Sequence, residues 1–291
     1  MNVVPPASTL DVIIVNYNTR ELLGAALRSL ETSEVKPDAV WVVDNASVDG
    51  SSDMVEHDFP GVRLVRSDRN LGFALGNNLA FERSTADLIL LLNSDAEVER
   101  DTIGALITAL ESDTRLGAVG PVLLSTSGSV QFEGGRRDPS ILGEFSNITH
   151  LNRVYPDGRL GGYMMNDWDH LSTREVEVLS GACMLLRREA LDGRLFLDDF
   201  FMYCEDVELC QRLRDAGWGL LYDASSRVLH HGGASSKQAR LKMRWAGVVS
   251  MAQLLSLRRG ALYALGYLAM VPFAWPLGMI VKRARLRGSP S

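Results

Sequence analysis

Residues 88–95 have the sequence LILLLNSD. The uninterrupted apolar run Leu88-Ile89-Leu90-Leu91-Leu92 predicts a strand that is buried on both faces of a sheet. Asn93 and Asp95 follow it at spacing i, i+2, and the ligands of open α/β sheets bind beyond the carboxyl ends of the strands. Oxygen ligands at alternate positions suit Mg²⁺ or Mn²⁺ that also holds a phosphate. The alternative is an Asx turn that caps the strand.

Apolar runs alternate with amphipathic segments on both sides of this strand. Strands are expected at residues 12–15, 40–43, 62–65, 88–92, 118–124 and 219–222, and helices after residues 19, 50 and 70 and over 100–115 and 206–217. This alternation predicts an α/β fold with a mixed, mainly parallel sheet. Residues 134–137 are expected to form a loop. Residues 139–175 lack clear periodicity and are expected to form a long excursion that helps to bind an acceptor.

Polar side chains end three of the predicted strands, at Asn16, Asp44 and the Asn93–Asp95 stretch. Three such ends on one edge of a sheet indicate a nucleotide site. Asp44 is expected to accept the N3–H of a uracil or thymine ring, while Asn45 and Ser47 shape the loop. The alternative is that Asp44 and Asn45 only cap the next helix.

The stretch 69–78, RNLGFALGNN, opens the following helix. It does not match the dinucleotide-binding pattern G-x-G-x-x-G, and the chain contains no Walker A sequence. We expect Gly72 to permit a close approach of chain or ligand, and Asn70 and Asn77 to contact the ligand.

A second carboxylate group lies in the sequence YCEDVELCQRLRDAG at residues 203–217. At about 100° per residue, Asp206 falls on the apolar stripe of the predicted helix, Glu205 near its border and Glu208 on the wet side. A buried carboxylate is costly unless it is paired or used, and a helix N-terminus favours the ionised form that a general base needs. The alternative is an internal N-cap. His230, after a later apolar run, is a further candidate metal ligand.

The composition is that of a globular protein, with 46% hydrophobic and 23% charged residues. The three cysteines fit no disulfide or zinc spacing, and the first ten residues do not resemble a signal peptide, so a cytosolic setting is expected. The net charge of −6 hides an asymmetry, because no acidic residue follows Asp223. A basic tail on an acidic body favours an anionic partner surface, and a membrane is preferred here over nucleic acid.

Residues 261–281 carry no charge and have basic residues on both sides. Their length is enough to span a bilayer core of about 30 Å. Pro272, Pro276 and the basic flanks favour an interfacial or re-entrant helical hairpin instead. We therefore divide the chain into a catalytic domain, residues 1–236, and a membrane-associating segment, residues 237–291. The alternative is a helical pair that packs on the body or on a second subunit of a homo-oligomer.

In this order the motifs resemble those of family 2 glycosyltransferases of the GT-A fold, and most closely the bacterial rhamnosyltransferase-like enzymes. The resemblance rests on IVNYN at 14–18, VDNAS at 43–47, RNLGF at 69–73, NSD at 93–95, SGA at 180–182, YCED at 203–206 and His230. It implies that a sugar is transferred with inversion and that the reaction depends on Mg²⁺ or Mn²⁺. The expected donor is dTDP-rhamnose, and the expected sugar is rhamnose. A lipid-linked or polysaccharide acceptor in cell-envelope glycan synthesis, at the cytoplasmic face of the membrane, is implied as well.

The same resemblance implies roles for individual residues. Asp44 contacts the base, Asn93 and Asp95 occupy the position of a DxD motif, Asp206 is the general base, with Glu205 beside it, and His230 reaches the metal. Asn93 stands where the strict motif has aspartate, which keeps an oxygen ligand but removes a charge. Two other functions stay open on the sequence alone: a sugar-phosphate nucleotidyltransferase, and a catalytically inactive membrane-bound protein that binds nucleotide sugars.

Overall fold

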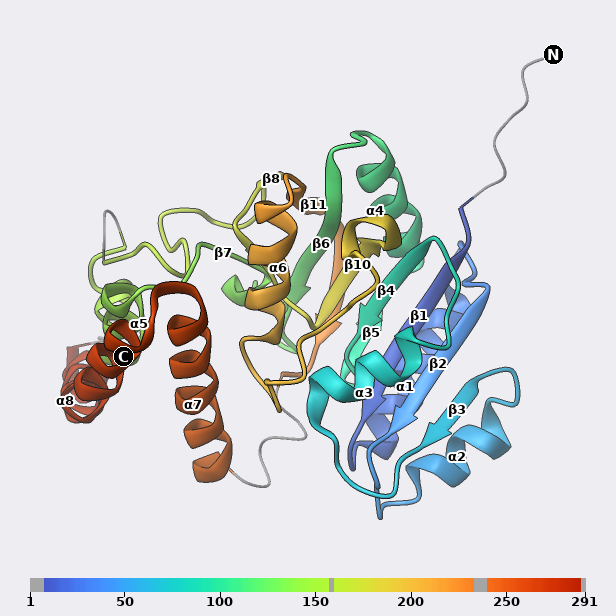
Figure 1. Ribbon diagram of the computed structural model, residues 1–291, viewed down its shortest axis with the longest axis horizontal. Helices are drawn as coiled ribbons and strands as arrows, with labels where there is room; N and C mark the ends of the chain where they lie inside the picture. Colours follow the sequence, from blue (N-terminus) through green and yellow to red (C-terminus); the bar gives the residue numbers. More distant parts are fainter. Residues whose placement is uncertain (1–7, 157–159, 233–239, 289–291) are drawn as a thin grey trace.

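A mixed sheet of nine strands forms the centre of the protein (Figure 1). The computed structural model describes residues 8–156, 160–232 and 240–288. Eight strands lie in the order β3-β2-β1-β4-β10-β6-β11-β5, and β8 pairs with β11. Their bounds are β1 Leu10–Asn16, β2 Ala39–Asp44, β3 Arg63–Arg66, β4 Leu88–Leu92, β5 Ala96–Val98, β6 Leu116–Leu124, β8 Arg174–Glu175, β10 Cys183–Arg187 and β11 Gly219–His230. The expected α/β class and mixed, mainly parallel sheet are confirmed.

Helices cover both faces of this sheet. Residues of α1, α2 and α4 pack in one hydrophobic cluster, and residues of α3, α6, α7 and α8 in the other. The bounds are α1 Arg20–Thr32, α2 Ser51–Asp58, α3 Gly72–Phe81, α4 Thr102–Glu111, α5 Ile141–Thr149, α6 Glu205–Asp215, α7 Arg240–Arg259 and α8 Ala261–Gly288. Every residue of β4 is buried between the two clusters, as its apolar sequence predicts.

Three stretches after residue 130 differ from what was expected. Residues 135 and 136, expected in a loop, form β7 Gly135–Arg136, which pairs with β9 Val178–Leu179. The excursion contains helix α5, which periodicity did not predict. The expected strand at 219–222 is only the first part of β11, which continues to His230 through an irregularity between Asp223 and Arg227.

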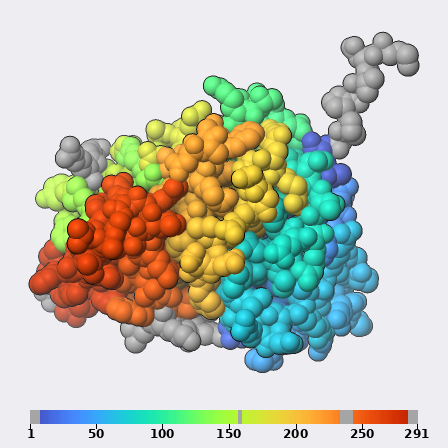
Figure 2. All heavy atoms as spheres, in the orientation of Figure 1, coloured from blue at the N-terminus to red at the C-terminus, as the bar shows by residue number. Residues whose placement is uncertain are grey.

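The C-terminal helices α7 and α8 lie beside α5 at the end of the molecule away from β1–β3 (Figures 1 and 2). Residues 261–281 were expected to form a hairpin, but they lie in one helix with Pro272 and Pro276 inside it. The turn instead lies at Gly260, between α7 and α8, where φ is +90°. Leu254 of α7 and Tyr267 of α8 belong to the same hydrophobic cluster as the sheet. That residues 237–291 act as a separate segment stays a prediction.

Candidate functional site

The first half of the site is a hydrogen-bonded network at the ends of β1 and β2. Asn16 and Asp44 are register partners at those ends. Nδ2 of Asn16 donates to Asp44 Oδ1 at 2.8 Å and to Ser47 Oγ at 3.1 Å, and the Ser47 amide donates to Asp44 Oδ2 at 3.1 Å. Thr19 Oγ1 donates to Asn16 Oδ1 at 2.6 Å. The structure therefore brings together Asn16, Asp44 and Ser47 in a preformed turn.

The following loop is fixed by the start of α3. Nδ2 of Asn45 donates to the Gly72 carbonyl at 2.8 Å, while its Oδ1 is buried without a hydrogen-bond partner among the described residues. Oδ1 of Asn70 accepts from the Gly72 amide at 2.9 Å. Asn77 is also buried, and its side-chain amide donates to the Phe73 carbonyl inside its own helix. That these asparagines contact a nucleotide-sugar donor stays a prediction.

Asn93, Asp95 and His230 meet where β4 and β11 end. Nε2 of His230 lies 3.4 Å from Asp95 Oδ1 and 3.3 Å from Asn93 Nδ2. The side-chain amide of Gln131 orients the ring: its Nε2 donates to the His230 carbonyl at 2.8 Å, and its Oε1 lies 2.7 Å from His230 Nδ1. The amide oxygen of Gln131 can accept a hydrogen bond from Nδ1–H, which leaves Nε2 directed at Asp95 and Asn93.

The chemistry of these donors fits a divalent cation. A carboxylate, an amide oxygen and an imidazole nitrogen are ligands that Mn²⁺ accepts, and Mg²⁺ takes the oxygens. The described residues contain no group of three or more His, Cys, Asp or Glu side chains placed to hold a metal. A cation here would therefore depend on Asn93 and on oxygens from a bound diphosphate to complete its coordination.

Asp206 lies in the first turn of α6 and is the second half of the site. Its Oδ2 accepts from Arg136 Nη2 at 2.7 Å and from the Gly181 amide at 3.3 Å, and its Oδ1 accepts from the Val207 amide at 2.8 Å. The side chain retains 15% of its exposure. The carboxylate is thus partly open to solvent and held by hydrogen bonds from a cation and two backbone amides.

The segment 180–182 contacts both Asn93 and Asp206. The Asn93 amide donates to the Ala182 carbonyl at 2.9 Å, and the neighbouring Gly181 amide donates to Asp206. A Cβ on Gly181 would lie 3.5 Å from Cβ of Asp206. The strand-end donors and the α6 carboxylate therefore flank one short stretch of backbone.

Two other acidic residues of α6, Glu205 and Glu208, are more buried than the helical phase predicts. Glu205 is 7% exposed, and its Oε2 has no hydrogen-bond partner among the described residues. Burial, with a smaller contribution from the charge of Asp206, raises the pKa of Glu205 to about 8. Glu208 was expected on the wet side but is 4% exposed. Arg212, one turn away, donates to the carbonyls of residues 194 and 195, so that segment covers a second side of the helix.

Arg136 is largely buried and pairs with Asp206. Its neighbour Arg137 donates to the Gly162 carbonyl and lies 3.4 Å from Asp167, and Arg153 is exposed. Two further residues were not predicted at all: Gln131, which orients His230, and Glu144 of α5, which faces Arg136. No local pattern marks them, because their roles arise from contacts between distant segments.

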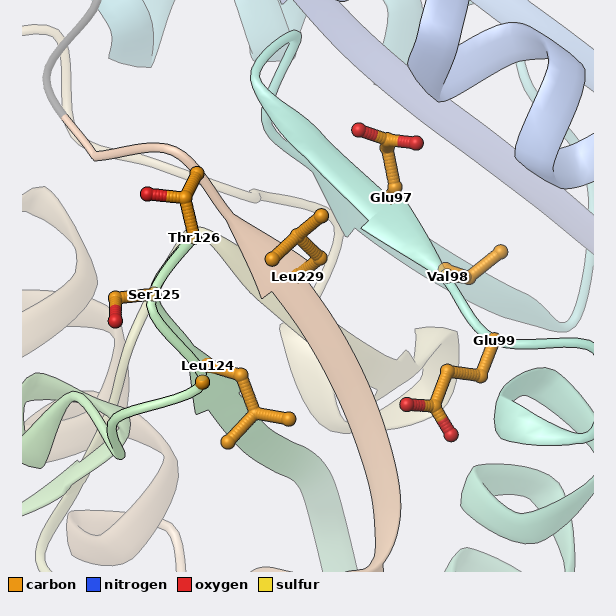
Figure 3. Close-up of a pocket in the computed structure, with 8 residues that line it drawn as sticks. Glu97, Val98, Glu99, Leu124, Ser125, Thr126 and Leu229 are labelled. Atoms are coloured by element: carbon orange, nitrogen blue, oxygen red, sulfur yellow. The ribbon is translucent and has the colours of Figure 1, made fainter.

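A separate hollow lies at the edge of the sheet (Figure 3). Glu97, Val98 and Glu99 of the β5 edge, Leu229 of β11 and the stretch 124–126 line it. Neither Asp206 nor Asp95 is among its lining residues. We therefore place the candidate site at the strand ends and α6 rather than in this hollow.

Comparisons with known proteins point to one family. The family model "Glycosyl transferase family 2" matches residues 11–195. The N-acetylglucosaminyl-diphospho-decaprenol L-rhamnosyltransferase of Mycobacterium tuberculosis is 33% identical over 243 residues, which cover 76% of each chain. The rhamnosyltransferase WbbL of Escherichia coli is 24% identical over 231 residues, covering 76% of this chain and 82% of that protein.

A solved structure shows the same fold. It is the mannosyltransferase PcManGT of Pyrobaculum calidifontis in complex with GDP-Man and Mn²⁺, which superimposes with a TM-score of 0.59 at 20% identity. The match covers 98% of this chain and 76% of that one. With the family model matching more than half of its length, the chain belongs to glycosyl transferase family 2 and is a glycosyltransferase.

Proposed function

We propose that this glycosyltransferase moves rhamnose from dTDP-rhamnose to a hydroxyl of a lipid-linked acceptor, with inversion at the anomeric carbon. The observation that carries the proposal is that two adjacent residues link Asp206 to the strand end. The Gly181 amide donates to the Asp206 carboxylate, and the Ala182 carbonyl accepts from the Asn93 amide. The relative that shares 33% identity is named for rhamnosyl transfer to N-acetylglucosaminyl-diphospho-decaprenol, which supports this donor and acceptor.

The surroundings of the two adjacent carboxylates favour Asp206 as the base. Glu205 is buried, and burial raises its pKa, which favours the protonated form at neutral pH and makes it the poorer base. Asp206 accepts the proton of the acceptor hydroxyl as that oxygen bonds to the anomeric carbon. The bond from this carbon to the diphosphate oxygen breaks, and its electron pair leaves with the diphosphate. Attack from the opposite face gives inversion and needs no covalent sugar–enzyme intermediate.

Asp95, His230 and Asn93 are the residues that would hold a divalent cation. When bound, such an ion neutralises charge on a departing diphosphate. Gln131 contributes by fixing the ring of His230 with Nε2 directed at Asp95. The Mn²⁺ in the structural neighbour supports divalent metal dependence, while the choice between Mg²⁺ and Mn²⁺ belongs to this proposal.

A lipid-linked acceptor requires the enzyme to work at a membrane, and we propose that α8 docks it on the cytoplasmic face. One helix of the described chain, spanning residues 261–283, is long and apolar enough to cross a membrane, and 28% of its most apolar window is buried. Because one side of α8 packs on the body, we favour a peripheral position in which the other side meets lipid.

Transfer assays test the proposal. The full chain is incubated with Mn²⁺, radiolabelled dTDP-rhamnose and N-acetylglucosaminyl-diphospho-polyprenol, with UDP-sugars as competing donors. We expect a labelled lipid product of inverted anomeric configuration. Retained configuration would contradict the mechanism. Transfer from a UDP-sugar but not from dTDP-rhamnose would contradict the donor, and donor binding without any transfer would favour the inactive binding protein. Formation of a nucleotide sugar from a sugar phosphate would indicate the nucleotidyltransferase.

A further inference from the structure

Arg136 lies at the centre of a buried group of ionisable side chains. Its Nη2 contacts Asp206 Oδ2 at 2.7 Å, its Nη1 lies 3.2 Å from the Tyr163 hydroxyl, and the guanidinium is 6.0 Å from the centre of that ring. The exposed fractions of the paired side chains are only 12% for Arg136 and 15% for Asp206. A partly buried ion pair of this kind is screened less than a fully exposed one.

The group is built from several segments far apart in sequence. The titratable side chains that interact with Arg136 or Asp206 are Glu144, Tyr163, Cys204, Glu205, Cys210 and the exposed Glu133. Farther out, Tyr267 interacts with Glu144 and Arg214 with Cys210. Glu144 comes from α5 and Tyr267 from α8, so the C-terminal helix helps to enclose the group.

Glu133 is exposed, and the other three carboxyl groups of the cluster, those of Glu144, Glu205 and Asp206, compete for the positive charge of Arg136. Burial raises the pKa of Glu205 to about 8 and that of Glu144 to about 7, and in each case the charge of Arg136 opposes the rise. Neither forms a hydrogen bond with the guanidinium. Asp206 does, and this pairing offsets the cost of keeping its carboxylate partly buried.

We propose that Arg136 is a positioning residue for the transfer reaction. Its guanidinium fixes Oδ2 of Asp206 and makes Asp206, rather than Glu205 or Glu144, the ionised carboxylate of the cluster. Oδ2 accepts two hydrogen bonds and Oδ1 only that of the Val207 amide among the described residues, so Oδ1 keeps a lone pair for the acceptor proton. This inference rests on the proposed role of Asp206 as the base.

Removing Arg136 therefore changes the pH at which Asp206 gains its proton. An opposite charge at hydrogen-bond distance favours the ionised form of a carboxyl group, so the loss of the guanidinium favours the protonated form. A base must be deprotonated to act, and activity falls below its pKa. The acid limb of the kcat/KM profile is therefore expected to move to higher pH in Arg136→Met, with a smaller move in Arg136→Lys.

The first measurement needs no substrate, so its outcome is separate from that of the transfer assay. The full chain is labelled with ¹³C at aspartate carboxyls, and the Asp206→Asn spectrum identifies the Asp206 resonance. We expect this resonance to titrate at higher pH in Arg136→Met and at intermediate pH in Arg136→Lys. Arg214→Met is the matched control, because Arg214 pairs with Asp138 in the same region, and it is expected to leave the titration at the wild-type value.

The second measurement is the pH profile of transfer from dTDP-rhamnose to N-acetylglucosaminyl-diphospho-polyprenol. Recovery of kcat/KM toward the wild-type value at high pH supports the proposal. A loss that is equal at every pH overturns it, and so does an unchanged Asp206 titration in a folded variant. If circular dichroism shows that Arg136→Met does not fold, Arg136→Lys carries both measurements.

Discussion

Asp206 and Glu205 are neighbours at the start of α6, and their environments give them different chemistry. Asp206 contacts Arg136 and Gly181, whereas Oε2 of Glu205 is buried without a partner in the described structure. A general base contributes about 10²- to 10⁴-fold to a rate. We expect Asp206→Asn to lower kcat by a factor in that range while the Kd for dTDP, measured by calorimetry, stays the same. Glu205→Gln should lose much less. The opposite ranking of the two variants would identify Glu205 as the base.

The candidate metal ligands at the strand ends lead to a separate prediction. Asp95 and His230 are the charged and imidazole donors of the candidate metal site, and Gln131 holds the imidazole in place. We expect Asp95→Ala to abolish the enhancement of dTDP binding by Mn²⁺, because the diphosphate is bound through the ion. Asn93→Asp should preserve or strengthen that enhancement, since it adds a charge to the donor set. Calorimetric titration with and without a chelator is the measurement, and equal wild-type affinities in both would contradict metal dependence.

At the scale of elements, the start of α3 is fixed by a close approach of two chain segments. The Phe73 amide donates to the Phe201 carbonyl at 2.8 Å, and Gly72 has φ of +83°. A Cβ on Gly72 would lie 2.1 Å from that carbonyl oxygen, so alanine cannot fit without moving the segment that leads to Asp206. Gly128 also has a positive φ, of +77°, but a Cβ on Gly128 would have no atom within 4 Å among the described residues.

These two glycines form a matched pair for measuring the approach. Gly128→Ala should cost only the strain of a left-handed residue, about 1 to 2 kcal/mol. Gly72→Ala should lower the free energy of unfolding further and also slow transfer, because the clash displaces the residues before α6. Urea unfolding and initial rates measure the two effects. Equal losses of stability in both variants would show that the contact with Phe201 does not constrain the fold.

Elements with a strong local pattern were predicted well, and those that depend on distant contacts were not. The bounds of β4 agree with its apolar run residue for residue. Helix α5 contains Gly143, Ser146 and Asn147 and is held by α8, more than a hundred residues later. Gly278 of α8 illustrates this dependence, because a Cβ there would lie 2.3 Å from the Ile148 carbonyl oxygen.

The same limit applies to the site. The strand-end residues Asn16, Asp44 and Asn93 could be located from the sequence, because strand ends are visible in a single sequence. The Arg136–Asp206 pair joins residues 70 positions apart, and nothing near either residue indicates the other. The prediction that Glu208 is exposed was wrong, because a helical wheel assumes one buried side and α6 is covered on two sides.

At the scale of the whole molecule, α8 presents two apolar faces with different surroundings. Ala264, Tyr267, Val271 and Ala274 are buried toward the body. At about 100° per residue, Leu262, Leu265, Phe273 and Ile280 lie together on the opposite side, and all are exposed, Leu262 at 86% and Phe273 at 78%. Truncating the chain near Ser256 would remove the buried face of α8 as well as the exposed one. Point substitutions on the exposed face are therefore the better test of membrane docking.

We expect the exposed face of α8 to insert shallowly into the interface of a membrane. Exposed Lys282 and Arg283 follow it, and each adds an attraction of about 1 kcal/mol to an anionic lipid surface. The full chain should therefore float with vesicles of phosphatidylglycerol and phosphatidylcholine, and less with phosphatidylcholine alone. The double variant Leu262→Asp/Phe273→Asp should remain in solution, because it places charge on the inserted face. Val48→Asp is the matched control, since Val48 is 91% exposed but belongs to the loop after β2. Val48→Asp should float like the wild type, and equal flotation of all three proteins at low and high salt would show that α8 is not the docking element.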